Sequence, residues 1–250
     1  PFSFFNVFSA NPPVLIFSPA RRVRDNTTKH TLENVLETRE VVINVVTYPM
    51  VQQMSLASTE YDRGVNEFEK AGFTMVPSEM VTPCRVGESP VQFECRVTKV
   101  EALGEEGGAG NLIFSEVVRM HLKKEVLDDE GRLDPAKLDL VARMGGNWYS
   151  RASDGLFEVP KPLSSKGVGV DAIPQAIRNS PILTGNDLGM LGNFEGIPTE
   201  AEVIAFVDGS VEARTALSSA DPLVIQKQAR AYLQEGDVGA AWKLLLAGLR

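Results

Sequence analysis

Four positive charges lie close together near the start of a chain whose formal net charge is -8. They belong to Arg21, Arg22, Arg24 and Lys29, and between Arg21 and Lys29 only Asp25 opposes them. Hydroxyl groups from Thr27, Thr28 and Thr31 are interspersed with them. A helix is expected over residues 31–40, and the free N–H groups at its start would point at the same place. These residue types at this spacing predict a site for an anion such as a phosphate.

Aromatic and small polar residues precede this basic island, which we define as residues 21–31. They are Phe2, Ser3, Phe4, Phe5 and Asn6. Taken separately, a cluster of Arg and Lys is more often solvated surface, and a Phe-rich strand is more often core. The order of strand, turn, strand, basic island and helix favours a site, because it brings an apolar slot close to an anion site. The combination predicts a mononucleotide cofactor.

Several motifs occur in the order expected of one known family. NVFSANPPVLIFSPARR is followed by KHTLENV, INVVT and QMSLAS, and later by EVVRMHL and RMGGNWYSR. From residue 1 to about residue 152 the chain therefore resembles the flavoredoxin-like branch of the FMN-binding flavin reductase family. The resemblance implies a split β-barrel that binds FMN noncovalently at a homodimer interface. It also implies that NADH or NADPH is a transient hydride donor and that electrons pass to a further acceptor.

The resemblance and the residue types together assign the FMN contacts. For the phosphate we expect Arg21, Lys29 and Thr31, helped by His30, within the motifs SPARR and KHT. Arg22 and Arg24 suit this role less, because alternate residues of an extended turn point in opposite directions. Candidates around the isoalloxazine ring are Ser3, Asn6, Ser18, Pro19 and Ala20. Further candidates are Asn34, which could instead hold the turn, and Met54 and Ser55, which the family places near the dimethylbenzene ring or the dimer partner.

His121 is one of only two histidines, and it matches the family position that lines the open face of the flavin. We therefore expect it to be the catalytic residue, with a structural histidine in a strand as the alternative. Trp148, Tyr149 and Arg151 match the segment that closes the pocket, although they could equally be interface packing. No metal site is expected, and hydride transfer needs no nucleophile or carboxylate dyad because the flavin performs the chemistry.

Composition agrees with an ordinary globular protein, since 43% of the 250 residues are hydrophobic and 23% are charged. The acidic balance argues against a nucleic-acid partner. No apolar run approaches the roughly 20 residues that span a membrane. Cys84 and Cys95 lack CxxC spacing, which favours reduced thiols in a cytoplasmic protein. The chain begins at a proline, so we expect a preceding segment to supply the first barrel strand.

Strands are predicted at residues 14–18, 41–47, 91–97 and 113–122. Helices are predicted at 31–40, at 62–71 before Gly72, and from Asp134-Pro135 to Gly145-Gly146. Closely spaced strands favour a barrel over a doubly wound sheet. The expected fold is mainly β with helices: an antiparallel, Greek-key split barrel over residues 1–152. A loop-rich wrap over the barrel is expected at 153–198, and a helical extension at 199–250.

The helical extension carries clear start signals. Thr199 and Glu202 form a capping box, Asp221-Pro222 opens another helix, and residues 235–237 join two antiparallel helices like a single tetratricopeptide hairpin. Without a second copy of that hairpin, we expect its apolar face to pack on the barrel or on a dimer partner. Two other functions stay open: a non-enzymatic flavin-binding redox sensor or partner-recruiting module, and a split barrel of the pyridoxamine-phosphate-oxidase type.

Overall fold

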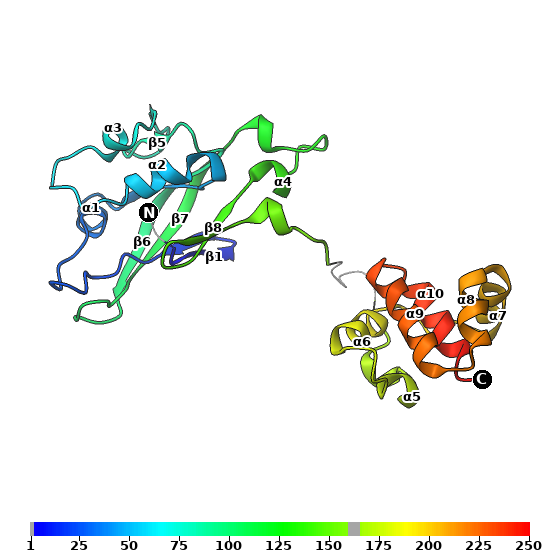
Figure 1. Ribbon diagram of the computed structural model, residues 1–250. Coiled ribbons are helices and arrows are strands. Elements are labelled where there is room, and N and C mark those ends of the chain that lie inside the picture. Colours follow the sequence, from blue (N-terminus) through cyan, green and yellow to red (C-terminus); the bar gives the residue numbers. More distant parts are fainter. Residues whose placement is uncertain (1–2, 160–165) are drawn as a thin grey trace. The chain divides into compact units, whose positions relative to one another are not determined.

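The computed structural model describes residues 3–159 and 166–250. It divides into two compact units (Figure 1). The first, Pro1–Phe157, is called here the sheet unit, and the second, Glu158–Arg250, the helical unit.

The sheet unit is built on five antiparallel strands in the order β1-β2-β7-β6-β3. These are β1 (Phe5–Ala10), β2 (Pro13–Phe17), β3 (Glu40–Asn44), β6 (Val91–Ala102) and β7 (Asn111–Leu122). The two long strands form the centre, and β1 and β3 lie at the edges of a sheet that is open across the described residues. The expectation of a mainly β fold with a helical extension is confirmed, whereas a closed barrel is not seen here.

Helix α1 (His30–Thr38), the helix predicted after the basic island, packs on the sheet through its two buried residues. Leu32 and Val35 of α1 share a core with a set of buried strand residues, namely Leu15, Phe17, Val41, Cys95, Val97 and Ile113. Each such fully buried aliphatic side chain contributes roughly 1.5–3 kcal/mol relative to an exposed one. The amphipathic spacing of α1 therefore fixes which face of the helix packs on the sheet, and its first residues directly follow the loop after β2.

Short elements complete the sheet unit. They are a 3-10 helix at Tyr48–Met50, α2 (Val51–Leu56), α3 (Glu67–Ala71), β4 (Met75–Val76), β5 (Arg85–Val86), a 3-10 helix at Lys124–Val126, α4 (Pro135–Leu138), β8 (Val141–Gly145), β9 (Trp148–Arg151) and a 3-10 helix at Ala152–Gly155. The predicted helix end at Gly72 is confirmed, since Gly72 has a φ of 67°. α3 starts later than predicted because Asn66 caps it.

The prediction of a helix from Asp134 to Gly145-Gly146 is wrong beyond its first turn. Asp134 caps α4 as expected, but the helix ends at Asp139 in a left-handed conformation, and a β8–β9 hairpin follows. Gly145 and Gly146 both have positive φ, 104° and 53°, so they form the turn of the hairpin. Two consecutive residues with positive φ are typical of tight hairpin turns.

The helical unit contains a 3-10 helix and six α-helices in its described residues. They are a 3-10 helix at Val170–Ala172, α5 (Gln175–Arg178), α6 (Gly185–Gly192), α7 (Glu200–Gly209), α8 (Val211–Ser218), α9 (Pro222–Gln234) and α10 (Val238–Ala247). The capping box of Thr199 and Glu202 is confirmed. A second one, formed by Thr184 and Asp187, starts α6.

Residues 166–198, expected from the sequence as a loop-rich wrap, group with the helical unit and contain α5 and α6. Ile173, Ile177, Leu183 and Leu191 lie in one buried cluster with residues of α8, α9 and α10. Trp242 of α10 is fully buried there, and its indole N–H donates to the carbonyl of Leu191 at 3.0 Å. The apolar face of the tail is thus buried within its own unit, which corrects the expectation that it needs the barrel or a dimer partner.

No helix in the described part of the chain is long and apolar enough to cross a membrane. Cys84 and Cys95 are free cysteines. Burial, together with the charge of Glu94, raises the pKa of the Cys95 thiol to about 12, so this thiol is a packing group and not a nucleophile.

Candidate functional site

The basic island folds as the loop between β2 and α1 and is attached to the turn between β6 and β7. The Arg21 N–H donates to the carbonyl of Ala109 at 2.8 Å, and the Gly108 N–H donates to the carbonyl of Arg21 at 3.0 Å. This turn requires glycine where the two segments meet, because a Cβ on Gly110 would lie 2.6 Å from the Ser18 hydroxyl. Residues about 90 positions apart in sequence are therefore held in contact.

The three arginines of the island are oriented by groups of the protein itself. Arg21 donates through Nε and Nη2 to the side chain and carbonyl of Asn26, both at 2.7 Å. Arg22 and Arg24 pair with Glu60 at 3.1 and 3.2 Å. These ion pairs offset the charges of Arg22 and Arg24, whereas the Arg21 guanidinium has only neutral oxygen partners in these bonds.

Hydrogen bonds also organise the centre of the island. Hydrogen bonds from the Thr27 hydroxyl and N–H, together with Arg24, lower the pKa of Asp25 to about 2. Arg22 donates to the Thr27 hydroxyl at 3.0 Å and to the carbonyl of Thr28. Asn26 adopts a left-handed φ of 57° and donates from its amide to the carbonyl of Glu105 at 2.9 Å. Asn26 therefore connects the island to Arg21 on one side and to the turn between β6 and β7 on the other.

Helix α1 begins within the island. Lys29 is its N-cap in an extended conformation (φ -86°, ψ 145°) and makes no side-chain cap hydrogen bond. Its carbonyl accepts the N–H groups of Leu32 and Glu33. Lys29, His30 and Thr31 are all half-buried. A helix start that no side chain caps, beside basic residues, is a suitable place for an anion.

Three further candidates lie directly before the island. Ser18 is buried and its N–H donates to the carbonyl of Phe4 at 3.0 Å. The carbonyl of Pro19 accepts from the Asn111 amide at 3.0 Å, and Ala20 is half-buried. The structure therefore brings Ser18, Pro19 and Ala20 together with Arg21.

The other ring candidates lie on different elements. Ser3 precedes β1 and Asn6 lies on it, both exposed. Asn34 is exposed on α1, and its carbonyl accepts from Thr38 at 2.9 Å. Met54 is half-buried and Ser55 is exposed, and both lie on α2.

His121 lies near the end of β7 and contacts a buried acid. Its Nε2 is 2.6 Å from Oε1 of Glu94, which is fully buried. Burial opposes ionisation of Glu94, but the N–H groups of Glu79 and Met80 and the His121 ring outweigh it and lower the pKa of Glu94 below its ordinary value. A carboxylate can only accept, so Nε2 of His121 is the donor.

Sequence reasoning missed Glu94 because the alternation of residues 91–97 places it on the polar face. The register of β6 against β7 shifts between Glu94 and Cys95, which indicates a β-bulge. A bulge turns two consecutive side chains inward, and both Glu94 and Cys95 are fully buried. Glu94 occupies a polar position of this alternating run, like Gln92 and Arg96, so nothing in the sequence signalled its burial.

Arg151 anchors the β8–β9 hairpin. Its Nε and Nη2 bind the two carboxylate oxygens of Asp139 at 2.7 and 2.8 Å, and its guanidinium lies 4.1 Å from the centre of the Tyr48 ring. The hydrogen bonds from Arg151 and Ser153 lower the pKa of Asp139. Tyr149 stacks under Arg143, and Trp148 is 79% exposed.

The candidates thus form two groups at opposite ends of the sheet. The island contacts the turn just before Asn111, where β7 starts, whereas His121 is one residue from its end. Ten residues of strand at about 3.3 Å each separate the ends by on the order of 30 Å. The hairpin belongs to the His121 end, since Asp139 bonds to Tyr48, just after β3, whose Asn44 lies beside Gln92. Within one chain, a mononucleotide at the island does not reach His121.

Residues 1–138 match the model of the flavin reductase like domain. The chain belongs to this family. The match lies within the sheet unit of this flavin reductase-like protein. An uncharacterised protein of Aquifex aeolicus is 38% identical over 152 residues, which are 61% of this chain and 75% of the relative.

Solved structures are also similar to this flavin reductase-like chain. Nitrilotriacetate monooxygenase component B from Bacillus cereus is 27% identical with a TM-score of 0.59, over 64% of this chain and 78% of that one. The 2-nitrobenzoate 2-nitroreductase NbaA from Pseudomonas fluorescens is 27% identical with a TM-score of 0.54, over 67% and 79%. Flavoredoxin of Desulfovibrio vulgaris shares the fold at 21% identity, with a TM-score of 0.53 over 65% and 81%.

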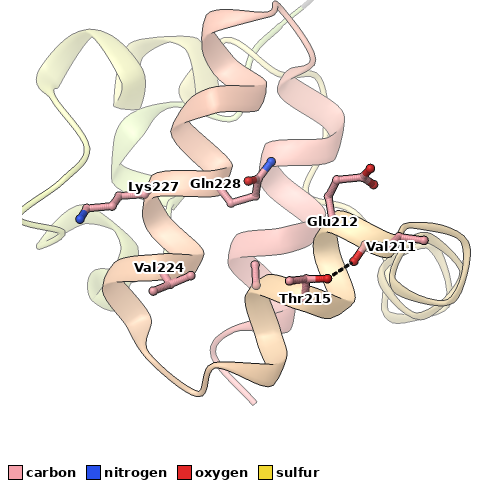
Figure 2. A pocket seen from close by; sticks show the side chains of 7 residues that line it. Val211, Glu212, Thr215, Val224, Lys227 and Gln228 are labelled. Atoms are coloured by element: carbon pink, nitrogen blue, oxygen red, sulfur yellow. Dashed lines mark hydrogen bonds between the residues drawn. The ribbon is translucent and has the colours of Figure 1, made fainter.

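The helical unit has a hollow of its own between α8 and α9, of about 480 Å³ (Figure 2). Val211 and Val224 give it an apolar part, and Glu212 and Lys227 carry opposite charges at its rim. The Thr215 hydroxyl donates to the carbonyl of Val211 at 2.8 Å, within the helix. This lining has no net charge, and in it we find no arrangement typical of catalysis.

Proposed function

We propose that the protein is an FMN-dependent oxidoreductase that takes a hydride from NADH or NADPH and passes electrons to an acceptor. The observation that carries the proposal is the basic island at the uncapped start of α1, in a chain that belongs to the flavin reductase-like family. The nitrilotriacetate monooxygenase component and the nitroreductase among the similar structures support an oxidoreductase.

The island fits the terminal phosphate of FMN. Arg21, held by Asn26, would give a fixed planar donor pair, and Lys29, His30 and Thr31 would add charge and N–H groups at the helix start. Ser18, Pro19 and Ala20 would lie along the path toward the ring. When bound, the flavin supplies the hydride acceptor, and the protein residues bind and orient it.

A homodimer would explain the separation of the two groups of candidates. The island of one copy and the His121 end of the other can meet only across an interface, since they are far apart within one chain. The start of the chain supports this idea, because Phe4, just before β1, and Val7 and Phe8 on β1 are 70%, 61% and 65% exposed. An apolar surface of this kind is typical of an interaction site.

We further propose that the open sheet is the described part of a split barrel. A structure from Shewanella frigidimarina with a split barrel domain supports this, with 26% identity and a TM-score of 0.55 over 64% of this chain and 76% of that one. We propose two parts in place of the three expected from the sequence: the sheet unit, 1–157, and the helical unit, 158–250, with a core of its own.

An absorbance spectrum before and after desalting tests whether flavin is retained. Under anaerobic conditions, NADH or NADPH is expected to bleach the flavin rapidly. Retained flavin that neither nucleotide bleaches would favour the redox-sensing or partner-recruiting alternative, for which the separate helical unit is the supporting observation.

Lys29→Met tests the phosphate site. We expect FMN binding to weaken by roughly 1.5–3 kcal/mol, the value of a hydrogen bond to a charged group, and riboflavin binding to change little. Arg24→Met is the matched control, because Arg24 is 73% exposed and paired with Asp25 and Glu60. Titration of both ligands by fluorescence measures the effect, and equal losses for FMN and riboflavin would remove Lys29 from the site.

A further inference from the structure

A second basic pocket lies at the far end of the sheet from the island. It has a volume of about 490 Å³ and is lined by segments around β5, β6 and β7, including Arg85, Gln92, Met120, His121 and Lys123. None of the described residues that line it is an aspartate or a glutamate. Its volume lies within the range of ordinary ligand pockets. We call it the His121 pocket.

Arg85 is held in place in this pocket. Its side chain is only 15% exposed. Nε and Nη2 donate to the carbonyl of Pro77 at 3.2 and 3.0 Å, and Nη1 donates to Oε1 of Gln92 at 2.9 Å. Gln92 is itself buried and donates to the carbonyls of Val86 and Ser89. A guanidinium fixed in this way loses little conformational entropy when it binds a ligand.

Two acids lie behind the pocket, and each is already bound by neighbouring groups. Glu94 lies 3.8 Å from Nε of Arg85 and accepts from His121 and two backbone N–H groups. Glu79 lies 4.0 Å from Nδ1 of His121 and pairs with Arg119 at 3.5 Å. The Nζ of Lys123 donates to the backbone carbonyl of Glu88 at 3.2 Å, and the carboxylate of Glu88 accepts instead from the N–H and hydroxyl of Thr74. Among the described residues, no carboxylate forms a salt bridge with Lys123.

We propose that the His121 pocket binds the carboxylate or phosphate group of an organic anion. Arg85 and Lys123 would bind the charged group, the N–H-donating ring of His121 would stay fixed by Glu94, and Met120 would contact the apolar part of the ligand. Within one chain this site lies on the order of 30 Å from the basic island, whereas in the homodimer proposed above it would lie beside the flavin of the partner subunit. The inference therefore deepens the proposed function by naming a class of ligand for that site, and its test uses binding alone, so that it can fail while the flavin chemistry stands.

Because the chain has only two histidines, NMR of the full-length protein with ¹⁵N-labelled histidine tests this site directly. His121 reports on the pocket, His30 reports on the island, and a His30→Gln variant assigns the two rings. Benzoate and phenyl phosphate are the anionic probes, inorganic phosphate tests a phosphate without an apolar part, and benzamide is the neutral control. We expect saturable shifts of His121 with benzoate or phenyl phosphate, little shift with benzamide, and no parallel shift of His30 with benzoate.

Two variants and a neighbouring control decide the assignment. Arg85→Gln and Lys123→Gln should each weaken anion binding about tenfold or more, as expected for loss of a charged hydrogen bond. Lys124→Gln, one residue along and outside the lining, should leave it unchanged. Lys123→Gln keeps the test valid if Arg85→Gln loosens the loop at Pro77. Equal binding of benzamide, an unmoved His121, or identical affinity in Lys123→Gln and Lys124→Gln would each overturn the proposal.

Discussion

The two units bury their apolar side chains to different extents. In the helical unit, Trp242, Leu191 and Leu244 are fully buried in one core. Its residues come from segments that precede and follow α7 in the sequence. In the sheet unit, a row on β1 and the tip of the β8–β9 hairpin leave large apolar side chains exposed, including Phe8 at 65% and Trp148 at 79%. The helical unit therefore has a core of its own, whereas the exposed apolar side chains of the sheet unit are the surface on which the proposed homodimer depends.

The chain has two tryptophans, the buried Trp242 of the helical unit and the exposed Trp148 of the sheet unit. Their replacement should give the largest difference in stability. Trp242→Ala should destabilise the helical unit by about 3–5 kcal/mol, because it removes a fully buried aromatic ring and its hydrogen bond to Leu191. Trp148→Ala should change the free energy of unfolding by less than about 0.5 kcal/mol. Denaturation followed by far-ultraviolet circular dichroism measures both. A comparable loss in the two variants would remove the contrast.

A charge on β1 should act on association and not on folding. Phe8→Glu places like charges near each other in any two-fold interface that uses this strand, so we expect dimerisation to weaken at least tenfold. Val211→Glu is the control, since Val211 is similarly exposed, at 61%, but lies on the helical unit. Sedimentation velocity measures the oligomeric state. A monomeric parent protein with bound flavin, or an equal effect of Val211→Glu, would contradict the role given to β1.

The smallest effect concerns the capping box that starts α7. Thr199→Ala removes the hydroxyl that accepts the Glu202 N–H, and should cost roughly 1 kcal/mol of the stability of the helical unit. Thr215→Ala is the matched control, because its hydroxyl bonds back within α8 and alanine is a better helix former there. Chemical denaturation of both variants distinguishes the cap from a general effect of losing a hydroxyl. Equal losses would show that capping is not the cause.

Local signals in the sequence predicted much of the fold. The β-branched runs, α1, the end of α3 at Gly72 and the capping box at Thr199 all follow from short-range chemistry. The glycine pair at 145–146 was misassigned because a glycine pair serves equally as a helix stop and as a hairpin turn. Residues 166–198 carry scattered apolar residues without a period, and only tertiary packing around Trp242 shows that they are core.

Local signals in the sequence also predicted part of the candidate site. The basic island is continuous in sequence, so its residues could be grouped without a structure. Its attachment to Ala109 and the pairing of Arg22 with Glu60 depend on long-range contacts. The distance between the island and His121 follows only from the register of β7. The burial of Glu94 arises from a bulge, which has no sequence signature of its own.

The buried carboxylate of Glu94 also makes the stability of the sheet unit depend on pH. The pKa of Glu94 is below its ordinary value of 4.5 in the folded chain, so the unfolded chain binds a proton at this position more readily. Its contribution to stability is complete above about pH 4.5 and is lost as the pH falls through the folded-state pKa. Protonation removes the charge that holds the N–H groups of Glu79 and Met80 and the ring of His121. Because one carboxylate holds both segments, we expect acid to release the end of β7 at His121 and the loop at Glu79 and Met80 together.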